Sequence, residues 1–585
     1  MSDRMHPIPF EDLLNWIIAE YRNQGSVFGC RSFWKAEKNR AGVPFFGRKL
    51  ENPLGPAAGP HTQLAQNIVA GYVSGGRLFE LKTVQILDGE DLHVNKPCIL
   101  AEDEGYNCEW STELTVPQAM EEYIKAWFLL HFLAAEYGFG AQDGFAFNMS
   151  VGYDLKGIQS PKIDTFIESM KDASGTAVWE ECRTVLRRHL HEFAHFSASE
   201  LDAVSPSISP SITVSTMHGC PAEDIEKIVV YLLEEKGLNL YLKCNPTLLG
   251  YDTVRTALDA LGFDYIQFKH ASFDHDLQYQ DAIPMIRRIR DKAVKLGRGF
   301  GVKLTNTFPV DVLKGELPDE TMYMSGRTLL PLSLRVAAAI GREFEGKLPV
   351  SYCGGIDASN VKEVAEAGLC PITICTDLLK PGGYGRLCKA VNALMTGADA
   401  AAESTSSNAC DMPAYAPQPE ALEALAARLC GKAKESRVIR RPGSYPAGAA
   451  CANCRIVCGN CESVCPNRAN VILMVDGKKQ MLHIDGMCNE CGNCASFCAD
   501  KTAPYQHKLT LFCSPKELAE SANNGFAPLD PGCARWQVRF GDKTEEYLVP
   551  GLGSGDAPQA SCDLPKEITD VIDTVRTSYP WLIYN

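Results

Sequence analysis

LPVSYCGGID (residues 348–357) and PITICTDLL (residues 371–379) are the two stretches that decide the fold of this 585-residue chain. Each is a short apolar strand pattern; the first ends at Gly354 and Gly355, the second at Cys375 and Thr376. Gly–Gly after a strand also suits an ordinary tight turn. In (β/α)8 barrels, however, the loops after strands 7 and 8 grip a phosphate group with backbone N–H donors. Together the two stretches predict the closing strands of such a barrel.

Upstream, short apolar strands alternate with helical patterns. LNLYLKCN (238–245) is followed by the helical YDTVRTALDALG (251–262) and then by FDYIQFKH (263–270). This alternation predicts a parallel sheet with crossover helices, and we interpret residues 51–396 as an α/β, (β/α)8 TIM barrel. FDYIQFKH and KLTNTF (303–308) compete for strand 6. Either Lys269 or Asn306 is therefore displaced from the barrel mouth.

The remaining sequence divides by composition. Residues 1–50 predict a helical lead-in, and residues 397–450 predict an Ala-, Ser- and Pro-rich linker with one helix. Residues 451–505 hold a dense group of cysteines around the hairpin pattern NVILMVDGKKQMLHID. Residues 506–585 predict a small segment of short strands with a final helix near 566–577.

Nine cysteines fall within residues 451–498 at metal-ligand spacing. In two-cluster ferredoxins the fourth cysteine of each motif ligates the other [4Fe–4S] cluster. We therefore assign one cluster to Cys454, Cys458, Cys461 and Cys498, and a second to Cys488, Cys491, Cys494 and Cys465. Cys451 is an alternative to Cys454 as the first ligand. Zinc knuckles also use C-x2-C pairs, but the number of cysteines and the Cys465–Pro466 ending favour an α+β ferredoxin-like domain.

Charge and composition exclude several functions and locations. A formal net charge of −15 argues against nucleic acid and anionic membrane surfaces as partners. The first residues, MSDRMHPIPFEDLLNW, have acids and a proline where a secretory peptide has an apolar stretch. The longest apolar segment, residues 126–135, is too short to span a bilayer. We expect a reducing, cytoplasmic location, where 24 cysteines would not form a disulfide scaffold.

A flavin is the expected second cofactor, because it links the one-electron chemistry of clusters to two-electron chemistry on an organic substrate. No strand-linked G-x-G-x-x-G for FAD or NAD is present. A Rossmann site is thus not visible in this sequence, whereas a barrel-type phosphate site is.

Several segments resemble a known group of FMN barrels. NPLGPAAGP (52–60), ELKT (80–83), MSGRTLLPLSLR (324–335) and YCGGID (352–357) resemble the dihydropyrimidine and dihydroorotate dehydrogenases. With STMHGCP (215–221) and the cysteine motifs, the whole chain looks most like the YgfK-type selenate reductase subunit family. Longer members add a carboxy-terminal FAD/NADPH half, which we do not find in this sequence.

The resemblance implies a set of FMN contacts at the carboxyl ends of the barrel strands. Lys243 would stabilise the anionic reduced flavin ring, although a salt bridge at the barrel mouth is an alternative role for it. The implied contacts are Ala57, Ala58, Gly59, Lys82, Thr83, Asn148, Lys243, Asn306, Gly326, Gly354, Gly355, Cys375 and Thr376.

Reduction of an unsaturated substrate by flavin also needs a proton donor. The dehydrogenases use a cysteine after strand 4, and Cys220 is the nearest match here, with His218 beside it. Both residues could instead only pack a loop. A helix beginning after Cys220 would lower the pKa of its thiol. For His61 we favour a turn-capping role.

Two functions fit these residues. In the first, the chain is a catalytic subunit in which FMN acts on an unsaturated N-heterocycle of the pyrimidine or purine type, with electrons exchanged through the clusters and a separate FAD/NAD(P)H flavoprotein. In the second, the chain only relays electrons to a separate molybdenum hydroxylase or reductase. A selenate reductase role is the weakest, since Arg327 is the one arginine predicted at the mouth.

Overall fold

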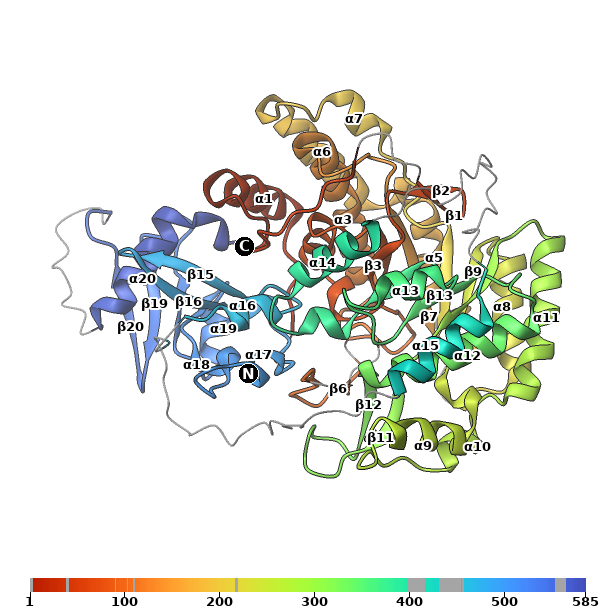
Figure 1. Cartoon of the computed structure of the whole chain (residues 1–585). Coiled ribbons are helices and arrows are strands. Elements are labelled where there is room, and N and C mark those ends of the chain that lie inside the picture. The colour runs from red at the N-terminus through yellow and green to blue at the C-terminus, as the bar shows by residue number, and fades with distance from the viewer. Residues whose placement is uncertain are drawn as a thin grey trace.

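The computed structural model describes residues 4–37, 42–89, 91–102, 104–108, 111–215, 219–396, 416–430, 454, 457–552 and 564–584. A parallel barrel forms the larger part and a thiol-rich module with its own sheet forms the rest (Figure 1). Among the described residues, no helix combines the length and apolar character needed to cross a membrane.

Eight parallel strands form a nearly closed barrel, as predicted. Backbone contact between its first and last-listed strands closes the ring: the Arg77 amide donates to the Leu54 carbonyl at 2.8 Å. Gly55 permits this approach, since a Cβ there would lie 1.6 Å from the Leu78 carbonyl oxygen. In sheet order the strands are β3 (Leu54–Pro56), β14 (Ile372–Ile374), β13 (Val350–Cys353), β10 (Phe300–Leu304), β9 (Asn239–Cys244), β8 (Ser211–Ser215), β7 (Ala146–Gly152) and β4 (Leu78–Glu80).

Helices cover the outside of the barrel (Figure 1). Helix α3 (Val116–Tyr137) shows why they begin where they do. The Thr115 side chain accepts a hydrogen bond from the Gln118 amide, and the Gln118 side chain accepts one from the Thr115 amide. The other covering helices are α2 (Ala65–Val73), α5 (Pro161–Lys171), α6 (Ala177–His189), α8 (Ala222–Glu234), α11 (Tyr279–Lys295), α12 (Leu330–Glu343), α13 (Val361–Glu366) and α14 (Tyr384–Met395). Helix α15 (Pro419–Cys430) packs against α12.

The competition for strand 6 is resolved in favour of β10. Residues 263–270 form no strand and lie between α9 (Tyr251–Ala260) and α10 (Ala271–Asp274). Lys269 is consequently displaced from the barrel: its side chain is 70% exposed and its Nζ lies 3.5 Å from an Asp311 oxygen.

A second sheet, which the sequence did not reveal, lies at the barrel mouth. It joins two insertions, one after barrel strand β4 and one after β10, in the order β11-β12-β6-β5. The strands are β5 (Ile99–Leu100), β6 (Glu104–Asn107), β11 (Phe308–Asp311) and β12 (Thr321–Gly326). A short hairpin, β1 (Val43–Phe45) and β2 (Arg48–Leu50), packs against Leu78, Ala146 and Tyr241.

The thiol-rich module is built on a six-stranded sheet. The predicted hairpin is present as antiparallel β15 (Asn470–Val475) and β16 (Lys478–Ile484). Strand β16 pairs with β17 (Thr510–Leu511), so the sheet crosses the boundary that we placed between residues 505 and 506. It continues through β18 (Gly525–Pro528), β19 (Arg535–Phe540) and β20 (Lys543–Leu548), and α20 (Lys566–Ser578) supplies the predicted final helix. The short helices are α16 (Asn460–Val464), α17 (Asn493–Ser496), α18 (Pro504–His507) and α19 (Pro515–Glu520).

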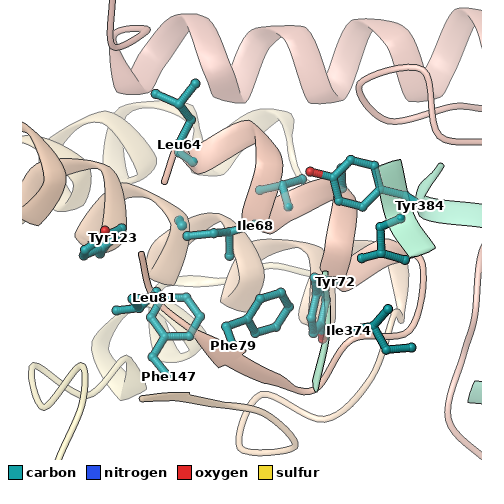
Figure 2. Close-up of a cluster of buried hydrophobic side chains, with 14 of the residues drawn as sticks. Leu64, Ile68, Tyr72, Phe79, Leu81, Tyr123, Phe147, Ile374 and Tyr384 are labelled. Carbon is teal, nitrogen blue, oxygen red and sulfur yellow. The ribbon is translucent and has the colours of Figure 1, made fainter. Parts of the chain in front are cut away.

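Aromatic side chains fill the layer between barrel and helices (Figure 2). Phe79 of β4 is fully buried and packs edge-to-face on Phe147 of β7 at 5.6 Å between ring centroids. Tyr72 and Ile68 of α2 are buried in the same cluster.

Replacing Phe79 with alanine should lower the free energy of unfolding by about 3–5 kcal/mol, because it leaves a cavity in a packed layer. Thermal or urea unfolding followed by tryptophan fluorescence measures the change. Leu313→Ala is the control, since this side chain is 54% exposed and should cost little. Equal midpoints for the two variants would contradict this assignment of the core.

Candidate functional site

A large cavity opens at the carboxyl ends of the barrel strands and extends under the mouth sheet. It encloses about 1660 Å³ of atom-free space, open mouth included. All the predicted FMN contacts except Asn148 line it: Ala57, Ala58, Gly59, Lys82, Thr83, Lys243, Asn306, Gly326, Gly354, Gly355, Cys375 and Thr376.

Asn148 lies inside the barrel and not on the cavity wall. Its amide nitrogen donates to Thr213 Oγ1 at 2.7 Å, and its oxygen accepts from Ser211 Oγ at 2.7 Å. These bonds satisfy a buried polar side chain within the barrel. The position therefore differs from the one the resemblance implied.

A buried ion pair forms the floor of the cavity. Lys303 Nζ on β10 lies 2.8 Å from Glu80 Oε2 on β4, and the two side chains are 1% and 5% exposed. Lys303 also donates to Thr373 Oγ1 at 2.7 Å and to Ser351 Oγ at 3.1 Å. We did not predict Lys303, although its register with Lys243 across β9 and β10 places both on the same barrel face.

Lys243 also lines the cavity, and within the described ranges it has no such ion pair. Burial lowers the pKa of its ammonium, the Glu80 charge opposes that change, and Lys303 and Lys82 add to it. A cation that lines the cavity is a suitable partner for negative charge that develops on a bound group.

Glycines shape the end of the cavity beside β13 and β14. Gly354, Gly355 and Gly326 have positive φ values of 126°, 70° and 74°. A Cβ at Gly355 would lie 2.7 Å from the Leu330 Cβ and 2.9 Å from the Gly326 carbonyl oxygen. Arg327 and Lys380 line the same cavity. Backbone that can approach a ligand closely, next to positively charged side chains, suits the binding of a phosphate group.

The wall on the side of β4 and β7 is polar but uncharged. It carries Gln85, Ser111 and Tyr153, and the mouth sheet adds Asn107 and Tyr323. Tyr153 has a φ of 93°, which is rare for a residue with a bulky side chain and is found most often at functional sites. No motif in the sequence marked these residues, because their insertions have no regular spacing.

The structure describes only one of the two predicted proton donors. His218 lies outside the described residues, and Cys220 is half-buried but is not among the residues lining the cavity. We expected a lowered pKa for Cys220. The pKa of this thiol is raised instead, first by burial and then by the charges of Asp224, Asp276 and Asp154.

His61 does not cap a turn. Its ring lies edge-to-face on Tyr384 at 5.2 Å, and its nitrogens have no well-formed hydrogen bond to the described residues. Burial lowers its pKa to about 3, so the ring is neutral.

The cysteines come together in the two predicted groups. Cys454, Cys458, Cys461 and Cys498 line one small cavity, and we call them the distal set. Cys465, Cys488, Cys491 and Cys494 are the proximal set: burial, then the neighbouring Cys465, Cys491 and Cys494, raises the pKa of Cys488. Cys451 lies outside the described residues. No group of three or more His, Cys, Asp or Glu in the described part of the chain is arranged around a single metal ion.

The proximal set lies against the cavity wall. The Cys491 carbonyl accepts from the amides of Cys98 and Ile99 at 3.0 and 2.9 Å. Cys491 also packs with Ile99, Ala101 and Leu379, and these three residues line the cavity from the other side. The distal set is farther out, and its Cys458 is exposed.

The barrel with its polar, cation-lined cavity is that of a TIM-barrel oxidoreductase. The family model described as "Oxidoreductase YgfK, N-terminal TIM-barrel domain" matches residues 28–434, more than half of the sequence. The chain belongs to this family of oxidoreductases.

Two curated proteins, both named "Putative oxidoreductase YgfK", are similar to this chain. One is from Escherichia coli strain K12 and the other from Escherichia coli O157:H7. Each is 50% identical over 401 residues, which cover 66% of this chain and 39% of the relative. The chain thus aligns with well under half of the length of these relatives.

Lys303→Met should lower the free energy of unfolding by about 3–5 kcal/mol, because it leaves the Glu80 carboxylate buried without its cation. Thermal unfolding measures this change. The double variant Glu80→Gln with Lys303→Met removes both charges and should recover part of the loss. If the single and double variants are equally unstable, the ion pair does not govern the stability of the barrel floor.

Proposed function

We propose that this chain is an FMN- and iron–sulfur-dependent oxidoreductase subunit, with FMN in the barrel cavity and a [4Fe–4S] cluster on each thiol set. The observation that carries the proposal is the direct contact between Cys491 of the proximal set and the cavity-lining Ile99. A one-electron carrier and a two-electron cofactor must be close neighbours to exchange electrons, and this contact provides that proximity.

The cavity fits FMN in two respects. Gly326, Gly354 and Gly355 give a cavity wall of backbone beside Arg327 and Lys380, whose charges would neutralise a phosphate. Lys243 and Lys82 line the inner part of the cavity, where cations would favour a reduced, anionic flavin ring. When bound, FMN would supply hydride chemistry and accept single electrons.

The thiol sets fit two cubane clusters. Four cysteines surround each site, and the fourth cysteine of each sequence motif belongs to the other motif's site, as in two-cluster ferredoxins. The exposed Cys458 places the distal set toward the exterior. Electrons would therefore enter or leave at the distal set. We infer that the partner there is a separate flavoprotein that binds FAD and NAD(P)H.

We call the polar wall on the side of β4 and β7 the substrate wall. Its side chains favour a neutral, planar N-heterocycle of the pyrimidine or purine type as the substrate. Gln85, Asn107 and Ser111 offer paired donors and acceptors, and Tyr153 and Tyr323 add aromatic rings. Amide side chains match the ring N–H and carbonyl groups of such compounds. Gln85, Ser111 and Tyr153 come after β4 and β7, whereas the phosphate is assigned to the loops after β13 and β14, so substrate and flavin phosphate would occupy different parts of the cavity.

Cys220 would supply the proton. Asp154, which follows Tyr153 at the cavity wall, acts on the Cys220 thiol, so Cys220 lies near the rim of the substrate wall. A thiol kept protonated by burial and acidic neighbours has a proton to donate.

The cofactor assignment predicts about one flavin and about eight irons per chain. Gly355→Ala should lose flavin and keep iron, because its Cβ would clash with Leu330 and the Gly326 carbonyl and so distort the loop that forms the phosphate grip. Gly297→Ala is a matched control: Gly297 also has a positive φ, 63°, but a Cβ there meets nothing within 4 Å. Chemical iron analysis and the flavin spectrum measure both. Zinc without flavin in the unaltered protein would overturn the proposed function, and full flavin in Gly355→Ala would overturn the phosphate assignment.

The substrate assignment predicts that a uracil- or purine-type compound changes the redox state of the bound flavin under anaerobic conditions, seen as a change in flavin absorbance. Cys220→Ala should slow that reaction by about 10²–10⁴-fold with flavin content unchanged. Tyr153→Phe is the comparison, since it removes a phenol hydroxyl at the same wall. An unchanged rate in Cys220→Ala would end its role as donor. If no such compound reacts while both cofactors are present, the chain relays electrons to a separate enzyme.

A further inference from the structure

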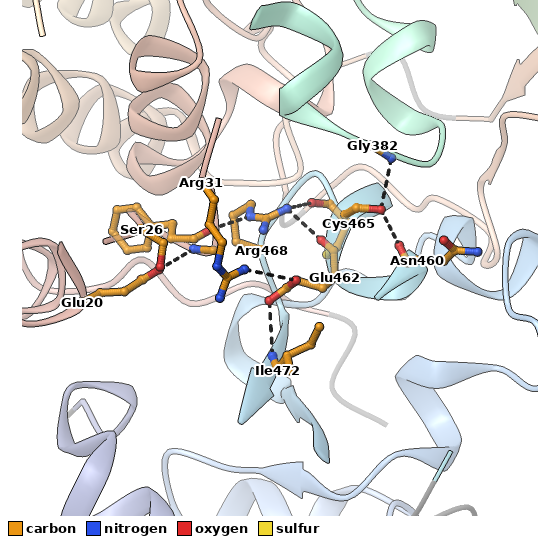
Figure 3. A network of polar contacts seen from close by, with 12 residues as sticks. Glu20, Ser26, Arg31, Gly382, Asn460, Glu462, Cys465, Arg468 and Ile472 are labelled. Atoms are coloured by element: carbon orange, nitrogen blue, oxygen red, sulfur yellow. Dashed lines mark hydrogen bonds and ion pairs between the residues drawn. The ribbon is translucent and has the colours of Figure 1, made fainter. Parts of the chain in front are cut away.

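Arg468 is a buried cation hydrogen-bonded to the backbone of Cys465, a member of the proximal thiol set (Figure 3). The residue is 4% exposed and follows Cys465 closely in the sequence. Its Nε donates to the Phe28 carbonyl at 2.7 Å, and its Nη1 donates to the carbonyls of Glu462 and Cys465 at 2.7 and 3.4 Å. These hydrogen bonds all go to neutral backbone groups.

The surroundings of Arg468 are built to hold its guanidinium group. Gly29 leaves the space: a Cβ there would lie 2.6 Å from Arg468 Nη2. Glu20 fixes the loop that presents the Phe28 carbonyl, because it accepts from Ser26 Oγ at 2.6 Å and from the Gly29 amide at 2.7 Å. Arg468 itself has a φ of 63°, a strained conformation for a residue with a side chain. The fold therefore bears a local cost to keep this cation buried.

The charge of Arg468 is not cancelled by a hydrogen-bonded carboxylate among the described residues. Glu462 is the nearby acid, but its oxygens accept from the Ile472 amide at 3.3 Å and lie 3.9 Å from Arg31. Charges act over longer distances in a protein interior than in water. Burial raises the pKa of Cys465, and Arg468 is the leading charge that opposes this rise.

The distal set has a different cation. Lys508 is 1% exposed, lines the cavity of the distal thiols, and acts on Cys461. Each thiol set thus has its own buried cation, Arg468 for the proximal set and Lys508 for the distal set.

We propose that Arg468 raises the reduction potential of the cluster held by the proximal set; this rests on the proposed function. Adding an electron makes a thiolate-bound cluster more negative, so a buried cation beside a ligand stabilises the reduced form. Arg468 acts through its charge alone, and it makes the cluster next to the cavity easier to reduce.

The test is an anaerobic redox titration of the full chain with both cofactors, followed by electron paramagnetic resonance. Cys458→Ser, which alters an exposed distal ligand, assigns the signals to the two clusters. Arg468→Gln should move the proximal midpoint potential to a more negative value and leave the distal one in place. Arg468→Lys keeps the charge and should stay near the unaltered protein. Lys508→Gln should move only the distal midpoint.

Arg31→Gln is a matched control, because Arg31 joins the same network but its side chain is 53% exposed and screened by solvent; neither midpoint should move. Unchanged midpoints in Arg468→Gln would overturn the proposal. Loss of half the iron in Arg468→Gln would also overturn it, because the residue would then serve cluster assembly. An unaltered protein without clusters would instead be a failure of the proposed function.

Discussion

Several hydrogen bonds hold the thiol module against the barrel, among them those from Tyr384 Oη to the Pro466 carbonyl and from Asn493 Nδ2 to the Leu379 carbonyl, and one backbone contact reaches the wall of the cavity itself. The Cys491 carbonyl accepts from two consecutive amides, those of Cys98 and Ile99. Both partners are backbone groups, so the contact is independent of side-chain rotamers. The segment that donates these bonds also walls the cavity with Ile99 and Ala101. One strand of the mouth sheet thereby determines both the shape of the cavity and its separation from the proximal set.

The buried charges inside the barrel have two different roles: one pair stabilises the barrel, and one cation faces the cavity. Glu80 and Lys303 satisfy each other across the barrel, and Thr373 links them by bonding to both. A satisfied pair of this kind costs little more than an apolar core, whereas an isolated charge would be expensive. Lys243, one strand away, keeps its charge available to the cavity. A cation that would destabilise an ordinary core is tolerated here because it faces a polar space.

The sequence was most informative where residues are close together along the chain. The strand ends at Gly354 and Cys375, the hairpin at 470–484 and both cysteine groups depend on local spacing, and the structure places them as predicted. The mouth sheet was not predictable, because β6 and β12 pair across more than 200 residues and neither has a distinctive pattern. Lys303 was missed for a different reason. Its ion pair with Glu80 joins β10 to β4 across the barrel, and nothing in the sequence around either residue indicates that pairing.

The pairing of β16 with β17 has a consequence for how this protein can be divided. A fragment ending near residue 505 would contain every thiol ligand, but the long strand β16 would lose its neighbour on that side. Unpaired strand edges offer free amides and carbonyls to other chains and promote aggregation. The segment after residue 505 therefore protects a strand edge of the thiol-rich module, and the two are best expressed and engineered together.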